Sequence, residues 1–156
     1  MSQSTTADQD DLANLVALLK LASLINRPML EEVAEPAGLS LNDLRVLMSL
    51  AGEGSAAAHD LSELMGMHPM SVSRSVSILR ETGTIDEVRD RENRRRKLLS
   101  LTEAGETRHR DLLPQAQQVA LRLFAALSAA ERRAAAGILA KLIKRLEAWP
   151  AQKAAE

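Results

Sequence analysis

The chain contains no cysteine and almost no aromatic residues, with one Phe, one Trp and no Tyr among 156 residues. The lack of thiols excludes disulfides, cysteine-ligated zinc, iron–sulfur clusters and thiol nucleophiles. It is also typical of a cytoplasmic location. The polar, acidic start MSQSTTADQDD is unlike a basic signal peptide, and no apolar run approaches the ~18 residues of a membrane span. The sequence therefore predicts a cytoplasmic protein without a membrane segment.

Glycine and proline are scarce as well, at seven and five residues, whereas Ala and Leu are abundant. This composition favours helices. A chain of this length can bury a hydrophobic core without disulfides or metals. The net charge of −1 argues against binding of polyanions by the whole surface. We expect one mainly α-helical domain over residues 1–156.

Dense apolar residues at both ends of the chain predict helices that need a partner. A helix from about Asp11 to Arg27 would be apolar on more than one face, and Pro28 should end or kink it. The final helix carries an apolar stripe of Ile138, Leu139, Leu142, Leu146 and Trp149. So small a domain cannot cover this stripe alone. We therefore expect the terminal helices to pack on a second copy of the chain.

Capping signals divide the middle of the chain into short helices. Ser40 and Asp43 have the spacing of a capping box, which predicts a helix that runs to about Ala51. The next helix should end at Gly66, and Ser55 is the candidate for its N-cap.

The following helix has two different faces. It should begin at Pro69, a favoured first helical residue, and end near Thr82. One face consists of Val72, Val76 and Leu79, at helical spacing. The opposite face is small, polar or adaptable and comprises Met70, Ser71, Ser73, Arg74 and Ser77. We expect the first face to be buried and the second to be available for binding.

A strongly basic segment follows between two short apolar stretches. From Arg89 to Lys97 there are six bases and two acids, a local charge of +4. The flanking segments 85–88 and 97–101 read as the strands of a small hairpin, because Leu99 and Leu101 share one face. Thr102 should cap a long helix, interrupted or bent near Pro114. On charge alone such a run is more often a solvated loop, but its position after these helices favours a nucleic-acid contact.

A short helix, a glycine-containing turn, a helix with a small polar outer face and a basic hairpin together describe a winged helix-turn-helix over residues 40–101. The second helix of such a unit enters the major groove of DNA. There Ser71 and Ser73 allow close approach, Arg74 can reach a guanine or a phosphate, and Met70 can touch a thymine methyl group. The candidate DNA-binding residues are Pro69, Met70, Ser71, Ser73, Arg74, Ser77, Arg89, Asp90, Arg91, Arg94, Arg95 and Arg96.

Two stretches carry a resemblance to the MarR family of bacterial transcription regulators. LSELMGMHPMSVSRSVSILRETGTI resembles its helix-turn-helix, and VRDRENRRRKLLSLTEAG resembles its wing and the start of the next helix. Within the second stretch, Asp90 and Arg94 meet the Asp-x-x-x-Arg spacing, and Leu101, Thr102 and Gly105 form Leu-Thr-x-x-Gly. Arg91 and Asn93 depart from the Pro and Asp common in the family, which bears on the geometry of the wing.

The resemblance implies a homodimer, with residues 10–34 and 103–148 as dimerisation helices and two winged lobes that read a pseudo-palindromic operator. Arg94 would lie at the wing tip in the minor groove, braced by Asp90. The same resemblance implies a repressor, controlled by a small aromatic or phenolic effector bound between the dimerisation and DNA-binding parts.

Other readings remain open from the sequence. The winged domain could bind a partner protein or act as an architectural module, although its Arg-rich hairpin disfavours a protein interface. An enzyme would need clustered acids or histidines that no motif indicates, so we expect no enzymatic activity and no cofactor. His59, His68 and His109 lack metal-ligand spacing and fit surface or capping roles better than a metal site.

Overall fold

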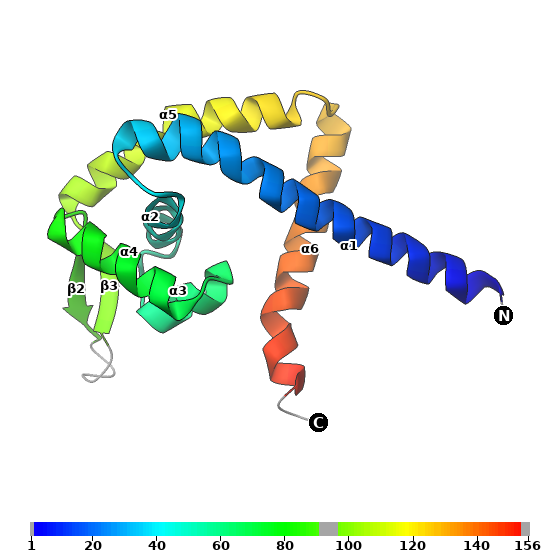
Figure 1. Ribbon diagram of the computed structural model, residues 1–156, viewed down its shortest axis with the longest axis horizontal. Helices are drawn as coiled ribbons and strands as arrows, with labels where there is room; N and C mark the ends of the chain where they lie inside the picture. Colours follow the sequence, from blue (N-terminus) through cyan, green and yellow to red (C-terminus); the bar gives the residue numbers. More distant parts are fainter. Residues whose placement is uncertain (1, 91–96, 154–156) are drawn as a thin grey trace.

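The computed structural model describes residues 2–90 and 97–153. Eight helical segments and three short strands occur in these ranges (Figure 1). In chain order they are α1 (Ser2–Met29), the π-helix η1 (Leu30–Ala34), the 3-10 helix η2 (Glu35–Ala37), α2 (Leu41–Glu53), β1 (Ser55–Ala56), α3 (Ala58–Met65), α4 (Pro69–Glu81), β2 (Ile85–Arg89), β3 (Lys97–Leu101), α5 (Glu103–Phe124) and α6 (Ala129–Lys153). The mainly helical winged helix-turn-helix fold predicted from the sequence is confirmed.

Helix α2 is the centre of the hydrophobic core. It contacts η1, α3, α4, α5, β1 and β3, and Leu44, Leu47 and Leu50 along it are almost fully buried. At its start the expected capping box is present: the Ser40 Oγ accepts from the Asp43 amide at 3.1 Å, and Asp43 Oδ2 accepts from the Ser40 amide at 2.9 Å. The cap fixes where α2 begins, and the leucines fix which face it buries.

The strands form one antiparallel sheet in the order β1-β3-β2. Ile85 pairs with Leu101 and Arg89 with Lys97, which gives the hairpin expected from the alternating pattern. The sequence did not indicate β1, whose Ser55 pairs with Ser100. Ser55 is therefore not the N-cap of α3. Ala57 holds that position, and its amide donates to Asp60 Oδ2 at 3.2 Å.

Helix α5 is anchored to the base of the hairpin by the Leu-Thr-x-x-Gly motif. The Thr102 Oγ1 caps α5 by accepting from the Gly105 amide at 3.0 Å, and it donates to the Gly83 carbonyl at 2.6 Å. Arg108, one turn further, donates to the Ala37 carbonyl at 2.7 Å and to the Thr84 hydroxyl at 3.1 Å. One end of α5 is thus tied both to η2 and to the turn between α4 and β2.

Helices α1 and α6 project from this lobe (Figure 1). Most of their large apolar side chains are exposed, for example Leu19 at 61% and Leu146 at 63%, although Ile25 and Met29 of α1 pack against the core. None of the helices within the described residues has the length and apolar character of a membrane span.

Two prolines have milder effects than the sequence suggested. Helix α1 runs through Pro28 to Met29 and then widens into the π-helix η1, so the proline changes the helix type without ending the helical path. Pro114 lies inside α5, which is continuous from Glu103 to Phe124 and is not interrupted.

Candidate nucleic-acid interface

Helix α4 separates a buried face from an exposed face as its sequence predicts. Val72, Ser75 and Leu79 are buried, and Val76 packs against the same core. Of the candidate DNA-binding residues on this helix, Pro69, Met70, Ser73, Arg74 and Ser77 are exposed and Ser71 is half-buried. The side chain of Met70 is 71% exposed, which is unusual for methionine on the surface of a monomeric protein. The outer face of α4 is therefore free for a partner.

The first turn of α4 is held by local hydrogen bonds. The His68 Nδ1 accepts from the Met70 amide at 3.2 Å, so His68 is the N-cap and Pro69 is the first helical residue. This agrees with the capping role expected for His68. The amides of a first helical turn point outward along the axis and carry partial positive charge, which suits contact with phosphate. On the same face, the Ser77 hydroxyl donates to the Ser73 carbonyl at 3.1 Å.

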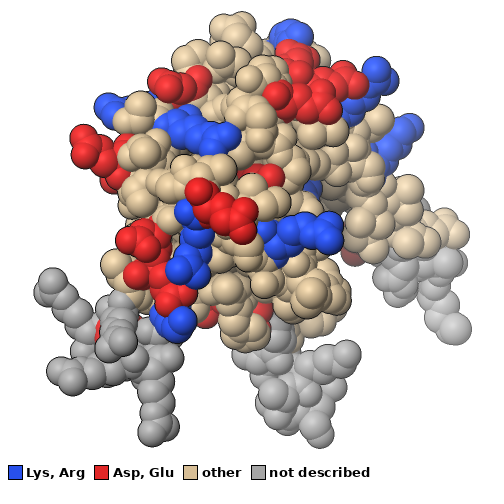
Figure 2. Space-filling view, turned by 60° about the vertical axis from the view of Figure 1, so that its left-hand side comes forward, with Lys and Arg blue, Asp and Glu red and all other residues tan. Residues whose placement is uncertain are grey.

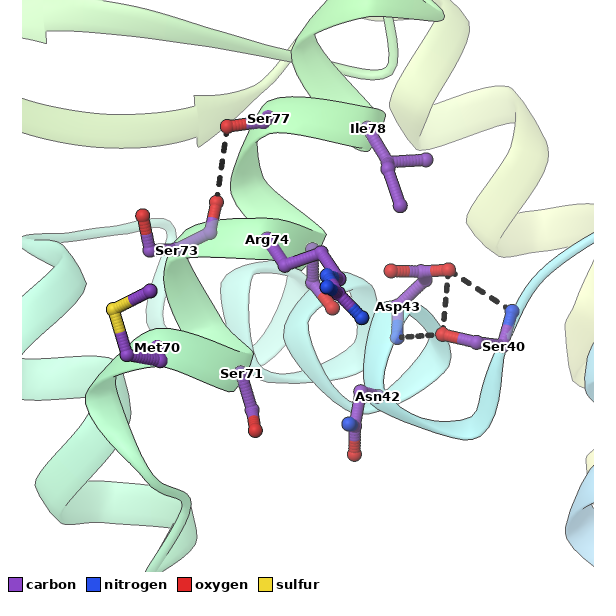
Figure 3. A pocket seen from close by; sticks show the side chains of 10 residues that line it. Ser40, Asn42, Asp43, Met70, Ser71, Ser73, Arg74, Ser77 and Ile78 are labelled. Carbon is purple, nitrogen blue, oxygen red and sulfur yellow. Dashed lines mark hydrogen bonds between the residues drawn. The ribbon is translucent and has the colours of Figure 1, made fainter.

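A surface hollow lies between the exposed face of α4 and the start of α2 (Figure 3). Helix α4 contributes Met70, Ser71 and Arg74, and α2 contributes Asn42 and Asp43. Asn42 and Asp43 were not among the residues predicted for the site. The capping box at Ser40 was visible in the sequence, but nothing in the sequence placed the start of α2 beside α4.

The wing extends from the same lobe through β2 and β3. Arg89 is the last residue of β2, and Asp90, which is half-buried, follows it directly. The predicted wing contacts Arg91, Arg94, Arg95 and Arg96 lie outside the described residues.

Salt bridges neutralise part of the positive charge on the strands of the wing. Glu87 on β2 accepts from Lys97 Nζ at 2.7 Å and from Arg80 of α4 at 3.4 Å. The hydrogen bond from Lys97 and the nearby positive charges of Lys97 and Arg80 lower the pKa of Glu87 from its ordinary value of 4.5. The sequence analysis counted Lys97 in the local charge of +4 and did not identify its pairing with Glu87.

No large single-sign patch covers the face shown in Figure 2, where Lys and Arg lie among Asp and Glu. Among the described residues, no group of three His, Asp or Glu side chains could hold a metal ion. The described site is therefore built from a helix face, a hollow and the two strands of a hairpin.

Comparison with known proteins gives consistent matches. The sequence model of the MarR family matches residues 37–96, from the end of η2 through the wing. The chain is also similar to the HTH-type transcriptional repressor MdtR of Bacillus subtilis (strain 168). The two are 30% identical over 132 residues, which cover 85% of this chain and 84% of that protein.

Solved structures match over most of the chain. One is BpsR of Bordetella bronchiseptica, from a study of the regulation of its DNA binding by 6-hydroxynicotinic acid. The TM-score is 0.69 at 22% identity, over 83% of this chain and 98% of that one. Another is a mutant MarR from E. coli in complex with operator DNA. The TM-score is 0.68 at 18% identity, over 85% of this chain and 96% of that one. At these identities the likeness establishes the fold.

Proposed function

Because the chain belongs to the MarR family of DNA-binding transcription regulators, we propose that it is a repressor that binds a pseudo-palindromic operator as a homodimer. The relative MdtR is described as a repressor, which supports repression rather than activation of transcription. The E. coli relative solved with operator DNA supports the kind of partner.

The observation that carries the proposal is the outer face of α4. Its exposed side chains are small or polar apart from Met70 and Ile78, and its buried face is packed on α2 and α3, so the helix is held rigidly by the lobe. A helix of this kind can enter the major groove, where Arg74 can bind guanine through two hydrogen bonds. The proposed contacts on α4 are Pro69, Met70, Ser71, Ser73, Arg74 and Ser77.

The wing supplies the second part of the proposed contact. Arg89 ends β2, and the other proposed wing contacts, Asp90, Arg91, Arg94, Arg95 and Arg96, follow it in the segment that joins β2 to β3. Arg94 is proposed to enter the minor groove. Cationic side chains at such a position bind phosphates and the negative potential of the minor groove. They give affinity for any duplex, whereas α4 gives the sequence preference.

Dimerisation is supported by the uncovered apolar faces of α1 and α6. Exposed apolar surface on this scale is characteristic of an interface. A second copy related by a two-fold axis would cover both helices at once and would place two α4 helices on one duplex. The proposed half-sites are then centred about one helical turn, ~10 base pairs, apart.

We also propose that a small aromatic or phenolic molecule releases the operator. The relative BpsR, whose DNA binding is regulated by 6-hydroxynicotinic acid, supports this class of effector. An effector must bind two dimer shapes with different affinity in order to shift DNA binding. Thermal-shift screening of phenols and aromatic carboxylates, with and without operator, tests this part separately.

In vitro selection of bound sequences from a random duplex library tests the main proposal. We expect a palindromic consensus and binding of it that survives excess non-specific DNA. Enrichment without a consensus would indicate an architectural protein instead. No binding to any duplex at low ionic strength would favour a protein partner for the winged lobe.

A further inference from the structure

Asp43 has one carboxylate oxygen with no visible partner. Within the described part of the chain it is the only charged side chain that is almost fully buried, with 3% exposed. Its Oδ2 accepts from the Ser40 amide at 2.9 Å and from the Ser40 hydroxyl at 2.6 Å. Its Oδ1 is buried and accepts no hydrogen bond. The capping box therefore uses only half of this carboxylate.

An unpaired buried carboxylate oxygen is unfavourable, because the group has lost its water without gaining a donor. A helix cap does not require this arrangement. At the start of α6, for example, Glu131 closes the capping box with Ser128 at the protein surface. The buried Oδ1 of Asp43 therefore calls for a donor that reaches it from the hollow.

Arg74 is the cationic side chain next to this oxygen. It lines the same hollow as Asp43, and Figure 3 shows its guanidinium group reaching from α4 toward the carboxylate on α2. Arg74 is exposed and makes no hydrogen bond or ion pair with another residue in the part of the chain that the structure describes. An unpaired donor group and an unpaired acceptor thus flank one hollow.

We propose that Asp43 is a positioning residue for Arg74 in DNA recognition, a role that rests on the proposed function. When α4 enters the major groove, the duplex excludes water from the hollow, and one N–H of Arg74 donates to Asp43 Oδ1. The guanidinium group has five N–H donors in a rigid plane, so two others remain for the O6 and N7 atoms of a guanine. Asp43 then fixes the plane of the arginine and with it the base that is read.

Because Asp43 is negatively charged, a role in orienting Arg74 can be distinguished from simple repulsion of DNA phosphates. A carboxylate near DNA repels phosphates, so its removal should strengthen binding to any duplex if repulsion is its only influence. If Asp43 orients Arg74, its removal should weaken binding to the operator and spare binding to non-specific DNA. The two effects have opposite signs on the operator.

A double-mutant cycle tests the proposal. Dissociation constants are measured for the wild type, D43N, R74A and D43N/R74A, on the selected operator and on a non-specific duplex at one salt concentration. Asn keeps an acceptor for the cap of α2 but removes the charge. We expect D43N to weaken operator binding about tenfold, which corresponds to the loss of a hydrogen bond to a charged group. In the R74A background, D43N should change operator binding less than about twofold.

Equal weakening by D43N with and without Arg74, or equal weakening on both duplexes, would overturn the role of Asp43. The matched control is S40A, which weakens the same cap but retains Oδ1 and should keep full discrimination of the operator. If D43N does not fold, the crystal structure of the wild-type complex decides. A guanidinium nitrogen of Arg74 should lie about 3 Å from Oδ1, and any other partner there refutes the proposal. Failure of the wild type to discriminate an operator would refute the proposed function instead.

Discussion

Gly105 lies where α5 passes the turn between α4 and β2. A Cβ atom built on it would stand 2.0 Å from the Thr84 carbonyl oxygen, which is a backbone atom that cannot rotate away. The same carbonyl accepts from the Thr102 amide at 3.1 Å. Close approach of two backbones is therefore the physical requirement behind glycine at the end of the Leu-Thr-x-x-Gly motif.

Substitution of Gly105 by Ala should destabilise the protein by about 3 kcal/mol, the upper end of the range for overpacking. Denaturant unfolding followed by circular dichroism measures this loss. The control is Gly52→Ala in α2, where a Cβ meets nothing within 4 Å. There alanine should stabilise by about 0.4–1 kcal/mol. Equal stability of the two variants would contradict the proposed contact.

Arg94 is the residue on which the wing contact depends. Arg94→Ala should weaken operator binding by on the order of 1–3 kcal/mol and reduce the salt dependence by about one phosphate contact. Titrations at several salt concentrations measure both. Arg110→Ala removes an equal charge from the exposed side of α5 and should leave binding nearly unchanged. An unaltered affinity and salt slope for Arg94→Ala would refute the proposed contact of Arg94 with DNA.

At the scale of elements, Glu87 offsets part of the positive charge carried by the strands of the β2–β3 hairpin. Glu87 pairs with Lys97 and Arg80 where the hairpin meets α4. In the sequence, most bases of the run from Arg89 to Lys97 follow β2, and the proposed function places the phosphate backbone beside this segment.

The lowered pKa of Glu87 predicts a pH dependence. A depressed folded-state pKa gives stability that is present above the ordinary value of 4.5 and is lost as the pH falls through the folded-state value. Lys97→Met should raise the pKa of Glu87 toward that ordinary value, because Lys97 is the largest cause of the shift. NMR titration of the Glu87 carboxyl measures it. Lys141→Met on α6 is the control and should leave the titration unchanged.

Helix α5 joins elements that are distant in sequence. Arg108 on this helix bonds Ala37, 71 residues earlier, and Thr84, 24 residues earlier. Arg122, near its other end, pairs with Glu32 of η1. The orientation of α4 relative to α5 therefore depends on a few long-range polar contacts in addition to the core, and these contacts connect the proposed dimerisation helices to the proposed DNA-binding face.

For the whole molecule, the central question is what covers α1 and α6. A leucine buried at an interface contributes about 1.5–3 kcal/mol to the free energy of association. Because the dimer has two-fold symmetry, each substitution is present in it twice. Leu19→Asp on α1 should therefore weaken dimerisation by at least ~100-fold and abolish operator binding at working concentrations. Sedimentation velocity measures the association, and circular dichroism checks that the lobe remains folded.

The matched control is Leu64→Asp on α3. Leu64 is also exposed, at 46%, but it belongs to the lobe and not to the projecting helices. This variant should remain a dimer. If Leu19→Asp dimerises as tightly as Leu64→Asp, the apolar face of α1 is not the interface.

Much of the fold could be predicted where the chemistry is local. The caps at Ser40, His68 and Thr102 all use groups two or three residues apart. The outward face of α4 followed from the spacing of its buried residues. Strand β1 could not be predicted, because a strand of two residues is too short to show an alternating hydrophobic pattern. Ser55 becomes a strand residue only by pairing with Ser100. The roles proposed for individual side chains at the DNA interface stay predictions.

The sequence by itself determined the helices, the hairpin and the exposed side of α4, because caps, turns and apolar periodicity act between residues within about one helical turn of each other. Only the tertiary structure decided that Asp43 would face Arg74, that Gly105 would touch Thr84 and that Arg108 would hold Ala37. Those neighbours arise when the leucines of α2 are buried from several sides at once. The sequence shows that these residues are apolar, but it does not show which other elements will cover them.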